Sequence, residues 1–246
     1  MAMIMPPTTP IRNRPRVSDQ ALLVRLMTWL SPAFPVGAYS YSHGIEAAVE
    51  AGLVQDRASL ADWIEAILAH GSGRTDAVFV AATMRAAENG DPEALGRVAK
   101  RAAAYRATAE LALESAAQGA AFLQAVRAAW PHPLLDTFAA RLTERDCAPA
   151  YPVAVGVAAA VLGVPEDLAV TAYLQAFSGN LVSAGLRLIP LGQTDGLKVL
   201  ASIEPVIHAV AQEALKMTMD EIGSATLMVD WTSMRHETQY ARLFRS

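Results

Sequence analysis

The residues that could carry chemistry gather in one segment, Tyr39-Ser-Tyr-Ser-His-Gly-Ile-Glu46. There Ser40 or Ser42 could act as a nucleophile that His43 activates. Neither serine lies in a Gly-x-Ser-x-Gly elbow, and neighbours along a chain rarely have the geometry of a relay. Capping of a short helix by one of these serines, with Glu46 in its first turn, is the favoured interpretation.

Other patterns that could carry chemistry are weaker. No Gly-x-x-x-x-Gly-Lys-Ser/Thr phosphate loop occurs, and Gly192-Gln-Thr-Asp-Gly-Leu-Lys198 lacks both its spacing and a preceding strand. The five histidines, at 43, 70, 132, 208 and 236, form no His-x-His or Glu-x-x-His pattern. Cys147 is the one cysteine, too little for a disulfide or a metal site. We therefore expect no enzyme, with no catalytic residue, no metal ligand and no cofactor.

The composition favours closely packed helices. Hydrophobic residues make up 53% of the 246 residues and aromatic residues only 7%, so alanine, leucine and valine supply the core, and alanine has the best helix propensity. The 20 basic and 24 acidic side chains give a net charge of −4 without a basic stripe. Nucleic acid is therefore not an expected partner.

The chain shows no targeting or membrane signal. Residues 1–17 mix proline, threonine and arginine without an apolar segment, which is typical of a flexible lead and not of a signal peptide. The most continuous apolar run, 153–164, is interrupted by two glycines and is far shorter than a membrane span. We expect no membrane association and a cytoplasmic location.

Start and stop signals divide the chain into helices. Ser18 can cap a first helix that Pro32 ends, and Asp91-Pro92 opens another with an N-cap followed by proline. Gly163 and Pro190 mark two further helix ends. We assign no sheet, because period-two alternation is absent. The fold class is all-α, a single helical-bundle-like domain of about ten helices.

Two local features of these helices are more specific. Ser59 and Asp62 are spaced as a capping box for the helix that ends before Gly71. The last long helix is expected from about 194 to 222, with a break or kink at Pro205.

The final segment, Ser233-Met-Arg-His-Glu-Thr-Gln-Tyr-Ala-Arg-Leu-Phe-Arg-Ser246, is unusual for a chain end. Three arginines, one glutamate and one histidine surround Tyr240, Leu243 and Phe244, and these apolar residues are too few to bury a helix face convincingly. A frayed end is the plain interpretation, and a segment kept for contact is the other. We divide the chain into a lead at 1–17, an all-α domain at 18–223 and a partner-docking tail at 224–246.

Three blocks carry a resemblance to a known family. The segment from Leu30 through Glu46 matches the pattern Ser-Pro-x-x-Pro-Val-Gly-x-x-Ser-x-Ser-x-Gly-x-Glu. Asn180-Leu-Val-Ser-Ala with Arg187-Leu-Ile-Pro-Leu-Gly-Gln-Thr-Asp-Gly196 forms the second block, and Met234-Arg-His-Glu-Thr-Gln-Tyr240 followed by Arg-Leu-Phe-Arg-Ser the third. In this order they resemble the urease accessory protein UreF family. Ala241 stands where serine is expected, and Arg187 where lysine also appears in relatives.

The resemblance implies an all-α homodimer that acts as a non-catalytic adaptor in urease maturation. It implies two partners, the urease-binding accessory protein UreD, also called UreH, and the nickel-carrying GTPase UreG. Together these deliver nickel to apo-urease. Two alternatives remain open: a regulator of the GTPase cycle that reaches the nucleotide with an arginine, and a helical enzyme whose pocket joins Tyr39, Ser40, Tyr41 and His43 to Arg187 or Asp195.

By family analogy, the early block and the 187–196 block are expected to lie close together or to line one partner-binding surface. The tail residues are of types favoured at contact anchors and are expected to dock mainly on the UreD-type partner. The complete set of expected partner-binding residues is Tyr39, Ser40, His43, Glu46, Arg187, Gln193, Thr194, Asp195, Arg235, His236, Glu237, Tyr240, Arg242, Phe244 and Arg245.

Overall fold

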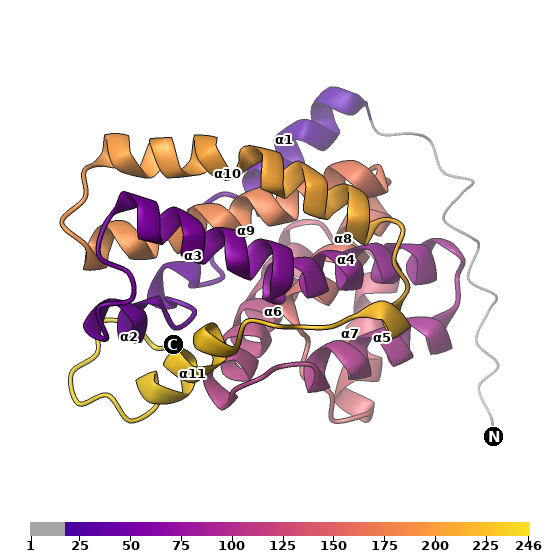
Figure 1. The fold of residues 1–246 in the computed structure, drawn as a ribbon. Helices are drawn as coiled ribbons and strands as arrows, with labels where there is room; N and C mark the ends of the chain where they lie inside the picture. Colours follow the sequence, from indigo (N-terminus) through magenta and orange to yellow (C-terminus); the bar gives the residue numbers. More distant parts are fainter. Residues whose placement is uncertain (1–17) are drawn as a thin grey trace, which may run out of the picture.

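The computed structural model describes residues 18–246, so the lead expected at 1–17 lies outside the described residues. Residues 18–246 form eleven α-helices and two 3-10 turns, with no strand among them (Figure 1). The prediction of an all-α fold is confirmed. Within this described part, no helix combines the length and the hydropathy that a membrane span requires.

The helices follow one another with short connections. Their bounds are α1 (Asp19–Trp29), α2 (Ile45–Glu50), α3 (Arg57–His70), α4 (Ser72–Glu88), α5 (Pro92–Ala104), α6 (Ala109–Ala129), α7 (Pro133–Glu144), α8 (Tyr151–Leu162), α9 (Glu166–Leu188), α10 (Gln193–Ala214) and α11 (Leu227–His236), with 3-10 turns η2 (Ala38–Ser40) and η3 (Met219–Glu221).

Several helix ends follow directly from the sequence. The Ser18 side chain accepts a hydrogen bond from the Ala21 amide, and Asp91 caps α5, whose first residue is Pro92. Gly163 ends α8 in the left-handed conformation, with φ 78°. The expected capping box was displaced by one turn: Asp56, not Ser59, is the N-cap, and it exchanges hydrogen bonds with Ser59.

The prediction for the last long helix was wrong about its end, and of the expected break or kink at Pro205 the break is absent. α10 runs unbroken through Pro205, because this residue lies on the exposed side of the helix, where water can satisfy the carbonyl that the proline leaves unpaired. The helix also ends at Ala214 and not near 222. The Glu221 carboxylate accepts from the amide and hydroxyl of Thr218, which stabilises the separate turn η3.

The centre of the core is α8, in which every residue except Val161 is buried. It lies between α4 and α6 (Figure 1). Gly156 permits the approach of α4, since a Cβ at this position would lie 2.8 Å from the Cβ of Thr83 and 2.9 Å from the carbonyl oxygen of Val80. Small residues thus let the backbones of α4 and α8 come close.

A second set of helices, α3, α9 and α10, packs against one side of this core. The last helix, α11, lies against α2 and the start of α6. The chain then turns back, so its final residues lie beside α2 and the segment before it (Figure 1). Two of the sequence blocks, far apart along the chain, therefore meet at one end of the molecule.

Candidate functional site: a buried polar cluster that holds the C-terminal tail

The segment before α2 has an unusual backbone. His43 and Gly44 are consecutive left-handed residues, with φ of 56° and 81°. Glycine is required at 44 for a second reason, because a Cβ there would lie 3.1 Å from the amide nitrogen of Ser233 in α11. The turn therefore fixes where α2 begins and lets α11 pack directly on it.

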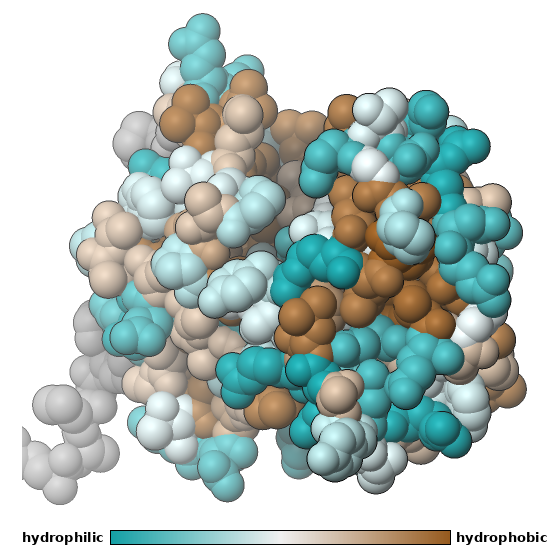
Figure 2. Space-filling view, turned by 90° about the vertical axis from the view of Figure 1, so that its left-hand side faces the viewer, coloured by the Kyte–Doolittle hydropathy of each residue, from teal (hydrophilic) through white to brown (hydrophobic). Residues whose placement is uncertain are grey.

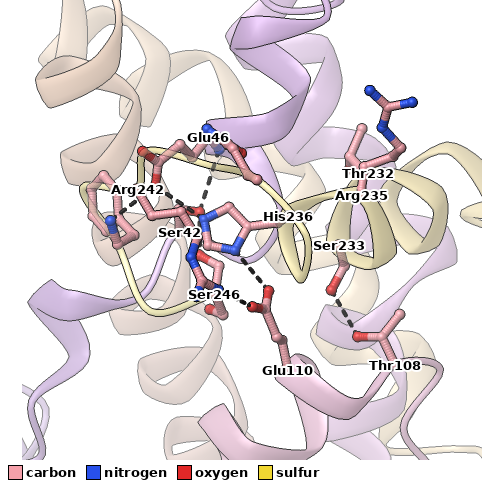
Figure 3. Close-up of polar contacts among 12 residues, drawn as sticks. Ser42, Glu46, Thr108, Glu110, Thr232, Ser233, Arg235, His236, Arg242 and Ser246 are labelled. Carbon is pink, nitrogen blue, oxygen red and sulfur yellow. Dashed lines mark hydrogen bonds and ion pairs between the residues drawn. The ribbon is translucent and has the colours of Figure 1, made fainter.

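His236 lies at the centre of the cluster and is fully buried. Its Nε2 is 3.1 Å from Oε2 of Glu46, and its Nδ1 is 2.7 Å from Oε2 of Glu110. Figure 3 shows the ring between the two carboxylates. Both ring nitrogens thus have a carboxylate oxygen as partner, one from α2 and one from α6.

The same two carboxylates also hold residues 237–246, which follow α11 and are called the tail from here on. Glu46 accepts hydrogen bonds from the backbone amides of Leu243 and Phe244, at 2.6 Å and 2.8 Å. Glu110 accepts from Nη1 of Arg242 at 3.0 Å. Both acids are thus shared between the last helix and the tail, and charge-assisted bonds of this kind are stronger than neutral ones.

The last residues pair with the early block. The backbone amide of Ser42 donates to the carbonyl oxygen of Ser246 at 2.8 Å, and the Ser42 hydroxyl donates to the same oxygen. The amide of Arg245 donates to the carbonyl oxygen of Ser40 at 2.8 Å. The tail is therefore fixed by the backbone as well as by charged side chains.

A second acid on α6, Glu114, extends the cluster. Its Oε2 accepts from the hydroxyl of Ser246 at 2.8 Å and lies 3.4 Å from Nδ1 of His43. Burial opposes ionisation of Glu114, but the charge and hydrogen bond of His43, the Ser246 hydroxyl and the charge of Arg106 together hold its pKa below the usual value. We treat it as a buried carboxylate.

Ser72, His43 and Glu114 stand in the order hydroxyl, imidazole, carboxylate. Nε2 of His43 is 2.7 Å from Oγ of Ser72, so the serine paired with His43 is neither Ser40 nor Ser42. The contact between Nδ1 and the carboxylate is long, and Gln118 and Ser246 also bind Glu114. The carboxylate therefore orients the ring and at the same time ties down the tail.

Arg187 connects the middle block to the other two. Its Nη1 donates to the carbonyl oxygen of Tyr39, and its guanidinium lies over the Phe244 ring, 4.2 Å from the centroid. Cation–π contacts of this kind favour a fixed ring position. The expected proximity of the early block and the 187–196 block is confirmed at Arg187.

Of the rest of the 187–196 block, Ile189 and Gly196 are buried, and the residues expected to bind a partner lie at the start of α10. Gln193 and Thr194 are exposed, and the Asp195 side chain accepts from the Gly192 amide at 3.3 Å. The cavity that His43 lines contains neither Arg187 nor Asp195 in its wall. The structure thus does not bring together the pocket that the enzyme alternative requires.

The expected partner-binding residues fall into two groups. Glu46, His236 and Phe244 are buried against the protein's own helices, and His43 is buried with them. The exposed group includes Tyr39, Tyr240 and Glu237, and Arg235, whose guanidinium lies 5.5 Å from the centroid of the Trp231 ring. Arg242 and Arg245 are exposed residues with internal contacts, to Glu110 and to the Tyr41 ring.

Sequence reasoning missed three members of the cluster, Glu110, Glu114 and Ser246, and considered Ser42 only as a nucleophile or a helix cap. One signal was available, since Glu110 and Glu114 are four residues apart in an alanine-rich helix and so lie on one face. Both are buried. Acids on a buried helix face require partners, and this points to cations from elsewhere in the chain.

Fold and cluster define a class of protein: a helical body whose most elaborate polar cluster binds its own C-terminal tail. The comparisons with known proteins add the family. The UreF family model matches residues 54–204, and the chain belongs to the urease accessory protein UreF family.

Curated relatives cover almost all of the chain. The urease accessory protein UreF of Bradyrhizobium sp. strain BTAi1 is 52% identical over 240 residues, which cover 95% of this chain and 98% of the relative. The protein of the same name from Rhodopseudomonas palustris strain HaA2 is 53% identical over 226 residues, covering 92% and 94%. That of Azorhizobium caulinodans is 51% identical over 221 residues, covering 90% and 94%. Family membership gives this protein a role in urease maturation as a non-catalytic accessory protein.

Proposed function

We propose that the protein is an adaptor that bridges the UreD/UreH-type accessory protein and the nickel-carrying UreG-type GTPase, so that nickel is inserted into apo-urease. The tail and α11 form the side that contacts the UreD-type partner. Family membership supports a role in urease maturation. The exposed apolar surface of α11 supports its assignment as the side that contacts the UreD-type partner.

The outward side of α11 is the observation that carries the proposal. Leu227, Met228, Trp231 and Met234 are 78%, 48%, 39% and 52% exposed. Their spacing places them along one stripe of the helix. Exposed tryptophan and methionine are enriched where proteins bind one another. Two further exposed residues, Tyr240 and Leu243, follow in the tail.

The buried cluster explains how this stripe can be presented in a defined position. His236 is the last residue of α11, and Glu46 and Glu110 hold it from α2 and α6. A surface that is already ordered loses less conformational entropy on binding. On the side of the molecule where α2 and the tail lie, hydrophobic surface is bordered by hydrophilic residues (Figure 2).

The test uses surface variants, because deletion of 233–246 would also remove His236 from the cluster. We expect Trp231→Asp combined with Met234→Asp to abolish copurification with the UreD-type protein, while Leu197→Asp, at a position 67% exposed on α10, leaves it intact. Undiminished copurification of the double variant, with an unchanged circular dichroism spectrum, would refute the proposed contact side.

Regulation of the GTPase cycle is the second candidate. The arginines proposed for it already have contacts within the protein: Arg187 with Phe244, Arg242 with Glu110, and Arg245 with Tyr41. These contacts favour the adaptor. GTP turnover by the UreG-type protein should be the same with the wild type and with Arg187→Ala. A loss of stimulation in the variant would support the regulator instead.

A homodimer in the cytoplasm belongs to the same proposal. A second apolar surface supports self-association, since Leu23, Val24 and Met27 of α1 are 58%, 65% and 66% exposed. α1 lies at the other end of the molecule from α11 (Figure 1). Light scattering should give twice the chain mass, and a single chain mass at working concentration would contradict the dimer.

A further inference from the structure

A groove of about 910 Å³ lies between one face of α1, the end of α6 and the end of α8. Its lining includes the buried side chains of Leu22, Trp29, Val126, Leu135 and Leu162. The exposed apolar residues of α1 that support the dimer are not among the lining residues. The groove is therefore a separate surface, which neither the adaptor proposal nor the dimer requires.

Two tryptophans give the groove an aromatic wall. The rings of Trp29 and Trp130 lie edge to face with their centroids 5.6 Å apart, and both residues line the groove. Trp29 is only 2% exposed, yet its Nε1 has no hydrogen-bond partner among the described residues. A buried donor without a partner indicates that an acceptor is missing. Proline-rich segments bind grooves with aromatic walls, because their rings pack on aromatic faces and their carbonyls are free to accept.

Acidic side chains outnumber basic ones around the groove. Asp19, Glu88 and Glu166 line it, whereas Arg25 is the one arginine or lysine of the lining. The Arg25 guanidinium lies over the Trp130 ring, 5.3 Å from the centroid. Glu166 is paired with an arginine of α4, and Asp19 is exposed in the first turn of α1. The groove thus suits a ligand that combines proline with positive charge.

The chain carries a segment with both properties next to the groove. Residues 1–17, which precede the described residues, contain prolines at 6, 7, 10 and 15, arginines at 12, 14 and 16, and no acid. α1 begins at Asp19, which lines the groove, so the segment is joined to one end of it. In the polyproline conformation residues 1–17 would reach about 50 Å, whereas α1 from Asp19 to Trp29 is about 15 Å long. The segment can therefore reach both tryptophans.

Because the segment is tethered, weak contacts suffice to hold it. A short tether gives an effective concentration on the order of millimolar, and prolines lose little conformational entropy on binding because their φ is already fixed. We propose that residues 1–17 bind the groove of their own chain, with the prolines at 6, 7 and 10 on Trp29 and Trp130 and the arginines near Asp19 and Glu88. The bound segment fastens α1 to the end of α8.

The four tryptophans of the full-length chain can report on this contact. Their indole N–H signals would be followed by NMR in the wild type and in a triple variant with Pro6→Ala, Pro7→Ala and Pro10→Ala. We expect the signals of Trp29 and Trp130 to shift, and those of Trp63 and Trp231, which do not line the groove, to stay in place.

The matched control carries Thr8→Ala and Thr9→Ala in the same segment and should shift none of the four signals. All these substitutions precede α1, so the helical body is unchanged. Trp29 and Trp130 signals that are the same in the wild type and the proline variant would overturn the proposal, as would equal shifts of all four tryptophans.

Replacement of the three arginines by glutamine tests the contribution of charge. Arg12→Gln, Arg14→Gln and Arg16→Gln together should move the Trp29 and Trp130 signals part of the way toward their positions in the proline variant, because exposed ion pairs contribute little each. High salt should do the same to the wild type. Signals that respond to neither change would remove the arginines from the contact.

Mixing shows whose segment lies in the groove. An isotope-labelled proline variant is allowed to exchange subunits with unlabelled wild type, and its Trp29 and Trp130 signals should stay shifted. Their return to the wild-type positions would show that the segment of a second copy fills the groove, which would overturn binding within one chain.

Discussion

The central helix α8 and the C-terminal tail are both held inside the protein, but by opposite means. α8 carries no charged side chain and is buried along nearly its whole length between α4 and α6. The tail is fixed by Glu46, Glu110 and Glu114 together with the cations that face them. Contact area stabilises the first region, whereas the positions of a few charges stabilise the second.

Because α8 is held by apolar packing and the tail by charged groups, the two regions should respond differently to substitution and to pH. Apolar packing depends on volume and is insensitive to the protonation of any one group. A buried cluster of charges tolerates no missing member, because removal of one leaves another uncompensated in a low-dielectric surrounding. Point substitutions can therefore separate the two regions.

The largest effect is expected at His236. Leucine at this position leaves the buried Glu46 and Glu110 facing each other without the imidazole between them. We expect a loss of about 3–5 kcal/mol in the free energy of unfolding, measured by urea denaturation. His208→Leu, at an exposed position of α10, is the control and should stay within about 0.5 kcal/mol. Equal stability of the two variants would contradict a charge-held tail.

Glu114→Gln should show that the tail cluster depends on pH. Its carboxyl has a lowered pKa in the folded protein, so its stabilisation is present at neutral pH and is lost as pH falls through the folded value. We expect the variant to be less stable by about 1.5–3 kcal/mol at pH 7. The difference should shrink in the acid range below the ordinary glutamate pKa of about 4.3. A gap that is the same at pH 7 and at acid pH would show that Glu114 is not an ionised member of the cluster.

Substitution of two glycines by alanine tests the close packing of α8 against α4. Gly156→Ala in α8 places a Cβ 2.8 Å from Thr83 and should cost about 1–3 kcal/mol. Gly179→Ala in α9 meets nothing within 4 Å, and alanine favours a helix, so we expect a gain of up to about 1 kcal/mol. Thermal unfolding at two pH values should show shifts of opposite sign that do not depend on pH. Similar shifts in both variants would mean that α4 and α8 are not in close contact.

The smallest effect is expected where the tail meets Arg187. Arg187→Ala removes the cation over the Phe244 ring and a hydrogen bond to Tyr39, both at an exposed position. We expect the free energy that holds the tail on the body to fall by about 0.5–1 kcal/mol. The variant's tail should be cleaved faster by a protease with little change in global unfolding, and Arg235→Ala, whose partner is the exposed Trp231, is the control. Equal cleavage rates would remove Arg187 from the contacts that hold the tail.

The same comparison explains which features the sequence could predict. The ends of α1, α5 and α8 follow from local chemistry, in the serine cap before α1, Asp91-Pro92 and the left-handed Gly163, and these were predicted. The end of α10 was not, because contacts of the Glu221 carboxylate with Thr218 form the separate turn η3. The continuity of α10 through Pro205 was not predicted either, because it depends on the exposure of that residue in the fold. Local rules thus describe the helical body well.

The site depends on contacts between distant residues. His43 and His236 stand out in the sequence by their polar and aromatic surroundings, but nothing local pairs His236 with Glu46 and Glu110. Phe244 resembles a partner anchor in sequence, yet it is buried under Arg187 in the structure. A charge or an aromatic ring near a chain end has the same sequence signature whether its partner is another protein or its own body.

Hydrogen exchange at the amides of Leu243 and Phe244 in the isolated protein tests the central claim most directly. Both amides donate to the buried carboxylate of Glu46, and we expect protection well above that of the neighbouring Tyr240 amide, which no described hydrogen bond engages. Glu46→Gln should reduce this protection. Exchange of Leu243 and Phe244 at the rate of an unstructured peptide would contradict the account, because the tail would then be free until a partner binds it.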